Sequence, residues 1–213
     1  MNIESLLYSL PAIIVGFTVH EYFHAYAAYK LGDSTAKNSG RLKLDPLRHI
    51  DPIGMIFIII AGFGWAKPVS FNPDNLSHPK RDRVIIALAG PFSNLIMGIA
   101  SLYLLKGFFY ISPYALANLP NNFAQALYKT LVLLLLRFGS INLGLFIFNM
   151  LPIPPLDGSH VFLSWLNLSS KTQYDFMQIG QLFLLGIIIM ERALGMTILP
   201  IGLFINKIVN FIL

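Results

Sequence analysis

The chain of 213 residues contains no cysteine, and only 12% of its residues are charged. The absence of cysteine excludes disulfide bonds and thiolate metal ligands. A soluble domain carries about twice this fraction of charged residues. Apolar residues make up 55% of the chain and gather in runs that are long enough to cross a bilayer. The composition therefore excludes an ordinary soluble domain and indicates a polytopic membrane protein.

Acidic residues are also few, because 10 Asp and Glu stand against 15 Lys and Arg, which gives a net charge of +5. In a soluble protein this balance would favour nucleic-acid binding. Here the basic residues lie in short loops between apolar runs, where they determine topology, so we expect no nucleic-acid partner. The N-terminus lacks a basic segment and a small-residue cleavage site, so the first apolar run is predicted to be a retained span.

Hydropathy predicts an all-α polytopic membrane protein of about five to six membrane segments, forming one domain over residues 1–213. Four runs are the clearest candidates for spans: residues 6–29, 84–105, 130–151 and 176–190. The last run, 196–213, forms either a further span or a hairpin with the run before it, so that 175–213 adds membrane segments to the core. The run 52–66 is interrupted by glycine and returns through proline, which is typical of a short re-entrant β-hairpin.

The charges of the loops predict the orientation. The loops 30–48 and 80–83 are basic, whereas residues 106–129 are predicted to form a loop with few charges. The positive-inside rule places the basic loops in the cytosol and the N-terminus outside. We expect the protein in a bacterial cytoplasmic membrane, with its chemistry toward the cytosolic side.

The first apolar run contains His20-Glu21-Tyr22-Phe23-His24, which is the pattern H-E-x-x-H. Residues four apart on a helix share one face, so both imidazoles can bind one Zn²⁺ ion. Glu21 lies beside His20 and can take a proton from a water that the metal activates. Chance placement of two histidines is a weak alternative, because ionisable groups at membrane depth are costly and usually functional.

A catalytic zinc ion commonly has three protein ligands and one open position. Asp157 is the best candidate for the third ligand, because it follows a proline-rich turn on the same predicted side of the membrane as the first two. His160 is a competing ligand and Asp51 a weaker rival, and Asp157 can also be interpreted as a helix cap. Two further histidines lie in basic loops and are expected to be solvated: His49 and His78.

Two more motifs follow H-E-x-x-H in order. Gly90-Pro-Phe-Ser-Asn94 has the pattern G-P-x-x-N, and residues 149–158 have the pattern N-x-x-P-x-x-P-L-D-G. With segments 40–54 and 64–73, these motifs make residues 10–165 resemble the site-2 protease family of intramembrane zinc metalloproteases, in its minimal branch without a PDZ or other regulatory domain. One departure is Ser159, where the family commonly has a second glycine.

The resemblance implies one Zn²⁺ per chain on three ligands: His20, His24 and Asp157. It implies that Glu21 is the general base and that Asn149 contacts the substrate backbone or the developing oxyanion. An interhelical hydrogen bond is the alternative for Asn149 and the favoured role for Asn94. The implied activity is hydrolysis of a peptide bond in a transmembrane protein or peptide, within the lipid bilayer, as in regulated intramembrane proteolysis.

A helical substrate must unwind before hydrolysis, and its freed backbone then needs hydrogen-bond partners in lipid. We expect residues 65–71 to supply them as an exposed strand edge. Two other functions compete with proteolysis. A catalytically silent membrane scaffold of the same fold would not need the intact Glu21, and a metal transporter would show ligands on several spans together with internal repeats.

Overall fold

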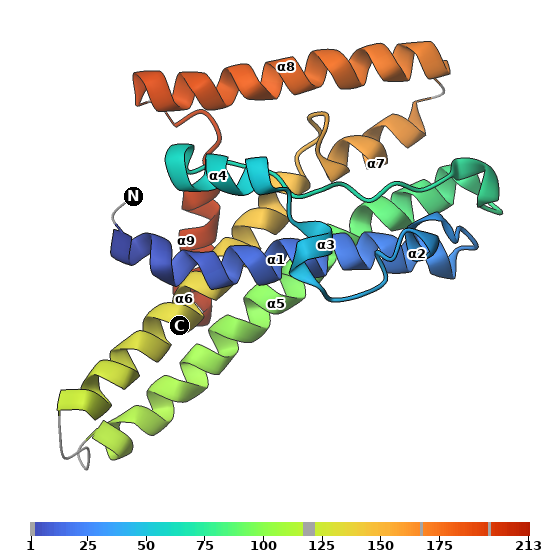
Figure 1. Cartoon of the computed structure of the whole chain (residues 1–213). Helices are drawn as coiled ribbons and strands as arrows, with labels where there is room; N and C mark the ends of the chain where they lie inside the picture. Colours follow the sequence, from blue (N-terminus) through green and yellow to red (C-terminus); the bar gives the residue numbers. More distant parts are fainter. Residues whose placement is uncertain (1–2, 117–121, 167, 196) are drawn as a thin grey trace.

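The computed structural model describes residues 3–116, 122–166, 168–195 and 197–213 (Figure 1). Three long helices form the centre: α1 (Ile3–Lys30), α5 (Pro79–Leu116) and α6 (Asn122–Asn149). Helices α5 and α6 pack side by side as a long hairpin, and α1 packs against both of them. Shorter elements complete the description: α2 (Thr35–Asn38), α3 (Pro46–His49), α4 (Pro52–Ala61), η1 (Pro73–Asn75), α7 (Asp157–Trp165), α8 (Ser170–Leu194) and α9 (Ile201–Ile212).

Within the described residues, four helices are long and apolar enough to cross a membrane: Ser5–Lys30, Pro79–Tyr110, Asn122–Asn149 and Lys171–Glu191. They correspond to the four clearest spans predicted from hydropathy, which confirms an all-α polytopic membrane protein. Helix α9 has 12 residues, so it reaches only about 18 Å at about 1.5 Å per residue. Of the two C-terminal helices, α8 alone is long enough to cross, and α9 packs against α6 instead.

The loop predicted over residues 106–129 is wrong for most of its length. Helix α5 continues to Leu116 and α6 already begins at Asn122, while residues 117–121 lie outside the described part of the chain. Aromatic residues explain the extension, because Phe108 on α5 stacks on Tyr128 of α6 with ring centroids 5.0 Å apart. The hairpin therefore continues beyond the most hydrophobic part of each helix.

A helix stands where the β-hairpin was expected. Asp51 precedes α4 and its carboxylate accepts a hydrogen bond from the Gly54 N–H at 2.9 Å, while Pro52 occupies the first helical position. These are the residues that start a helix. The chain then returns in extended form and makes one isolated β-bridge, between Ile50 and Ala66; the described residues contain no strand. Re-entry of this element into the bilayer stays a prediction.

The returning segment is tied to the end of α1 by Asp33, whose side chain is fully buried. Its carboxylate accepts hydrogen bonds from Thr35 Oγ1 at 2.6 Å, from Asn75 Nδ2 at 2.7 Å and from the Asn72 N–H at 2.9 Å. Burial by itself would raise the pKa of Asp33, but these hydrogen bonds lower it below its ordinary value. The charged carboxylate therefore fixes the segment before α5 against the turn that ends α1.

Helix α8 lies apart from the three central helices, beyond α4 and the returning segment (Figure 1). Its buried positions form one narrow stripe, Gly180, Leu184 and Ile187, at a spacing that places them on a single helix face. Pro154 packs so closely on Gly180 that a Cβ there would lie 2.6 Å from a Pro154 carbon. The turn that leads into α7 is therefore held between the centre and α8.

Candidate metal centre

Three ligand-type side chains meet where α1 faces the start of α7, which packs against α5. His20 and His24 lie on one face of α1, and Asp157 is the first residue of α7. The two Nε2 atoms are 3.0 Å apart, and the Asp157 carboxylate oxygens lie 3.1 Å from His20 Nε2 and 3.4 Å from His24 Nε2. The ligand atoms of all three residues lie within 4.8 Å of one another.

The second nitrogen of each imidazole contacts helix α5. His24 Nδ1 lies 2.7 Å from the backbone carbonyl oxygen of Ile86, which can only accept a hydrogen bond. His24 therefore donates through Nδ1, which leaves Nε2 free to offer a lone pair to a metal ion. His20 Nδ1 lies 2.5 Å from Oδ1 of the fully buried Asn94.

A chain of amides sets the direction of the His20 hydrogen bond. Asn142 Nδ2 donates to the Phe138 carbonyl at 2.9 Å, so its Oδ1 is the atom that accepts from Asn94 Nδ2 at 2.9 Å. Asn94 Nδ2 also donates to the Gly16 carbonyl at 3.1 Å. Its Oδ1 must then accept, so His20 donates through Nδ1 and keeps its Nε2 lone pair for the cluster. Asn94 makes the expected interhelical hydrogen bonds and also orients His20.

The donor set fits a divalent cation. Two imidazole lone pairs 3.0 Å apart are unfavourable unless a positive charge lies beside them. Asp157 Oδ2 is buried and accepts no hydrogen bond from the described residues. A Cβ on Gly90 would lie 2.3 Å from His24 Nε2 and 2.8 Å from His20 Nε2. Glycine at this position therefore leaves open the space that both nitrogens face, and two nitrogens with one carboxylate suit zinc.

The turn before α7 aims the Asp157 side chain. A Cβ on Gly158 would lie 2.4 Å from the Met150 carbonyl oxygen, so only glycine allows this close approach. Ser159, which departs from the family pattern, is buried and its hydroxyl donates to the Leu156 carbonyl at 2.7 Å. Burial by itself would raise the pKa of Asp157, but positive charge on the facing imidazoles, His24 first and then His20, lowers it. A bound cation would supply the same positive charge and leave both Nε2 lone pairs free. The carboxylate is therefore charged.

The carboxylate of Glu21 is buried beside the cluster and is held from outside α1. Its Oε2 accepts from the Val69 N–H at 3.0 Å and lies 3.9 Å from Arg41 Nη2. The Arg41 guanidinium also donates to the carbonyls of Arg48 and Lys67. Arg41 was not singled out from the sequence, although it lies in the segment 40–54 that carries part of the family resemblance.

The other predicted residues lie elsewhere. Asn149 donates to the Leu145 carbonyl of its own helix at 2.9 Å, and no described contact joins it to the cluster. His160 is exposed and lies outside the three-residue group, and Asp51 caps α4.

The expectation that His49 is solvated is wrong, because it is fully buried and its Nε2 donates to the Lys43 carbonyl at 2.8 Å. His78 is exposed, as expected.

Fold and site together define a membrane-embedded protein with a histidine–histidine–aspartate cluster that could hold a metal ion and with an adjacent glutamate. Comparison with known sequences gives the family directly. The pattern of peptidase family M50 matches residues 8–187, and the chain belongs to this family. The family also comprises the site-2 proteases, which confirms the resemblance inferred from the motifs.

The chain is 42% identical over 158 residues to "Putative zinc metalloprotease YwhC" of Bacillus subtilis, which covers 72% of this chain and 67% of that protein. It is 29% identical over 150 residues to "Putative zinc metalloprotease Rip2" of Mycolicibacterium smegmatis, and 27% identical to the protein of the same name in Mycobacterium tuberculosis. These alignments cover 68% of this chain and 52% of each mycobacterial protein, so the chain spans about half of their length. No solved structure gives a significant match.

Replacement of Gly90 by alanine is expected to abolish metal binding, because the added Cβ would occupy the space that His20 Nε2 and His24 Nε2 face. Zinc content per chain, measured on purified protein, checks this. Gly107→Ala is the matched control on the same helix, because a Cβ there meets no atom within 4 Å. A Gly90→Ala protein that keeps its zinc would contradict the assignment of this space to the metal.

Replacement of Asn142 by leucine is expected to weaken zinc binding about 10–100-fold, because Asn94 loses the acceptor that fixes its orientation toward His20. Competition with a zinc-binding dye measures the affinity. Asn149→Leu is the control, since that amide bonds only within α6 among the described residues and should leave zinc affinity unchanged. Equal losses in both variants would show that Asn142 acts through general packing and not through His20.

Proposed function

We propose that this chain is an intramembrane zinc metalloprotease that hydrolyses a peptide bond of a transmembrane protein or peptide. The observation that carries the proposal is the position of Glu21. Its buried carboxylate lies beside the cluster of His20, His24 and Asp157, and the Val69 N–H holds it in place. A metal site that serves structure alone needs no such carboxylate.

Each residue has a role in this proposal. His20, His24 and Asp157 hold one zinc ion per chain, and His20 and His24 are kept in the correct tautomer by Asn94 and the Ile86 carbonyl. When bound there, zinc supplies Lewis-acid chemistry that makes water a strong nucleophile near neutral pH and polarises a carbonyl group. Glu21 accepts the proton of the attacking water and delivers it to the departing amine.

Asn149 is proposed to donate to the negative charge that develops on the substrate carbonyl oxygen. Its amide has two N–H donors, of which the Leu145 carbonyl uses one, so a second remains for this role. The whole chain 1–213 is proposed to act as one membrane-embedded domain. The loop charges favour a site that faces the cytosolic side of a bacterial cytoplasmic membrane.

The extended segment after α4 is proposed to bind the unwound substrate. Its inward side is occupied, because the Lys67 N–H donates to the His49 carbonyl at 2.8 Å and the Val69 N–H donates to Glu21. Backbone groups alternate in direction along an extended chain. The outward side therefore carries the Pro68 carbonyl and the exposed Ser70 N–H, which have no partner among the described residues.

Replacement of Glu21 by glutamine is expected to abolish cleavage while leaving zinc bound, because the amide cannot accept a proton from water. Purified protein in detergent is tested on a generic single-span substrate, with zinc content determined on wild type and variant. Loss of at least about 10³-fold in turnover with about one zinc retained supports the proposal. Equal turnover in both proteins would overturn the role of Glu21 and turn attention to a scaffold or transport function.

Replacement of Ser70 by proline is expected to reduce turnover about tenfold or more by removing an outward N–H that pairs with the substrate. The base contact at Val69 and the zinc content should stay intact. Ser70→Ala is the matched control, since it removes the hydroxyl and keeps the N–H. Equal turnover in the proline and alanine variants would show that substrate does not pair with this edge.

A further inference from the structure

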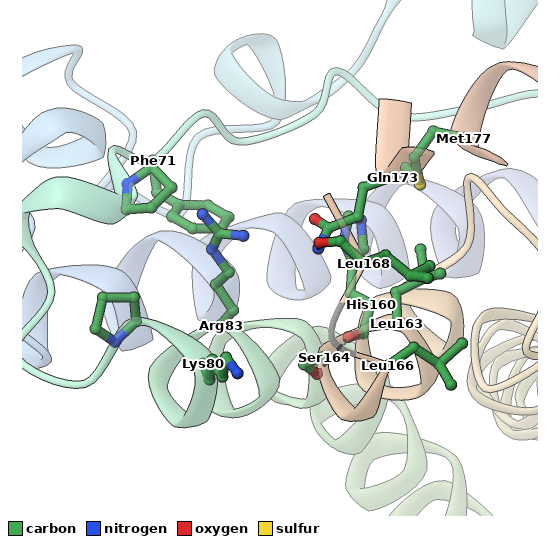
Figure 2. Close-up of a pocket in the computed structure, with 12 residues that line it drawn as sticks. Phe71, Lys80, Arg83, His160, Leu163, Ser164, Leu166, Leu168, Gln173 and Met177 are labelled. Carbon is green, nitrogen blue, oxygen red and sulfur yellow. Dashed lines mark hydrogen bonds between the residues drawn. The ribbon is translucent and has the colours of Figure 1, made fainter. Parts of the chain in front are cut away.

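A cavity of about 610 Å³ lies between the start of α5, helix α7 and the start of α8 (Figure 2). Arg83 and Phe71 lie on one side of it, and Leu168, Gln173 and Met177 lie on the other. Apolar side chains form much of the wall, but Lys80 and Arg83 add positive charge and His160 adds an imidazole. None of the twelve described residues that line the cavity is acidic.

Two walls of the cavity continue directly into the metal centre. On α5, Arg83 precedes Ile86 by three residues, about one turn, and the Ile86 carbonyl holds His24. On α7, His160 follows Asp157 by the same interval. The cavity and the metal centre are therefore neighbouring compartments built on the same two helices.

The extended segment makes the third connection. Phe71 lines the cavity and lies two residues after Val69, whose N–H holds Glu21. A substrate strand that pairs with the outward edge of residues 66–70 would therefore run along this segment toward Phe71 and the cavity. A side chain of the substrate close to the scissile bond can enter it.

The positive charge of the cavity determines which kind of substrate side chain it can bind. Arg83 Nε is buried, and no group in the described part of the chain accepts a hydrogen bond from it. A buried donor without an acceptor costs about 1–3 kcal/mol, more when it is charged. A carboxylate brought by a ligand would form a charge-assisted pair with the guanidinium of Arg83, which lines the cavity (Figure 2).

We propose that this cavity binds an acidic side chain, Asp or Glu, next to the scissile bond of the substrate, with Arg83 as its main partner. The inference rests on the proposed protease function and names the class of substrate. On the predicted topology the cavity faces the cytosolic side, where most membrane proteins carry Lys and Arg beside their spans. The basic cavity repels the Lys and Arg residues of these common flanks and attracts an acidic residue. Both effects favour a substrate with an acidic flank.

The test compares two single-span peptides that differ only at the cytosolic flank of the span, one with three glutamates and one with three lysines. Binding is measured by fluorescence in neutral detergent, with zinc-loaded protein that carries Glu21→Gln to prevent cleavage. The acidic peptide is expected to bind about tenfold tighter than the basic one. Arg83→Glu should reverse this preference, and Arg83→Gln should reduce it to less than about twofold.

Lys37→Glu is the matched control, because it makes the same change of charge at an exposed residue outside the cavity, and it should keep the preference for the acidic peptide. Zinc content near one per chain shows that each variant is folded. Equal binding of both peptides, or a preference that survives in both Arg83 variants, would overturn the proposal. So would an Arg83-dependent binding of phosphatidylglycerol without any peptide preference, which would assign the cavity to a lipid headgroup.

The same peptides given to protein with an intact Glu21 separate the two proposals. Cleavage of both peptides at equal rates would support proteolysis and overturn the acidic subsite. Arg83-dependent binding of the acidic peptide without cleavage of either peptide would support the subsite and overturn proteolysis.

Discussion

Two imidazole rings inside an apolar bundle each need a buried hydrogen-bond acceptor, and much of the structure serves to supply these acceptors. Each ring must donate through one nitrogen if the other is to offer a lone pair, and the acceptor must come from another buried element. His24 uses the Ile86 carbonyl and His20 uses Asn94, so both rings depend on α5. The close packing of α1, α5 and α6 is thus also the condition for a usable pair of metal ligands.

Glu21 and the extended segment after α4 are also held by shared contacts. Arg41 contacts the Lys67 carbonyl and lies near Glu21, while the Val69 N–H bonds to Glu21 itself. Asp33 fixes the same segment at its far end through the Asn72 N–H. Glu21, the proposed base, and the backbone that is proposed to receive a substrate are therefore held by the same contacts.

The sequence predicts the parts of this arrangement that depend on local periodicity. His20 and His24 share a face because four residues make about one helical turn, and the long apolar runs become the long helices. Residues 52–61 form a helix where the apolar pattern predicts part of a β-hairpin. A ten-residue apolar run fits a strand or a helix equally well, and the pair Asp51-Pro52, which caps the helix, decides between them. Partners far apart in the chain, such as Asn94 with Asn142, depend on helix packing that no local pattern contains.

The order of the candidate ligands along the chain also determines when the site becomes complete during biosynthesis. His20 and His24 enter the membrane first, α5 supplies their acceptors next, and Asp157 arrives only after α6 has been made. A partly inserted chain therefore has no complete set of donors for the proposed metal ion. On the proposed function, chemistry at this site can start only when the last central element is in place, so the order of the helices along the chain itself delays activity until the bundle is complete.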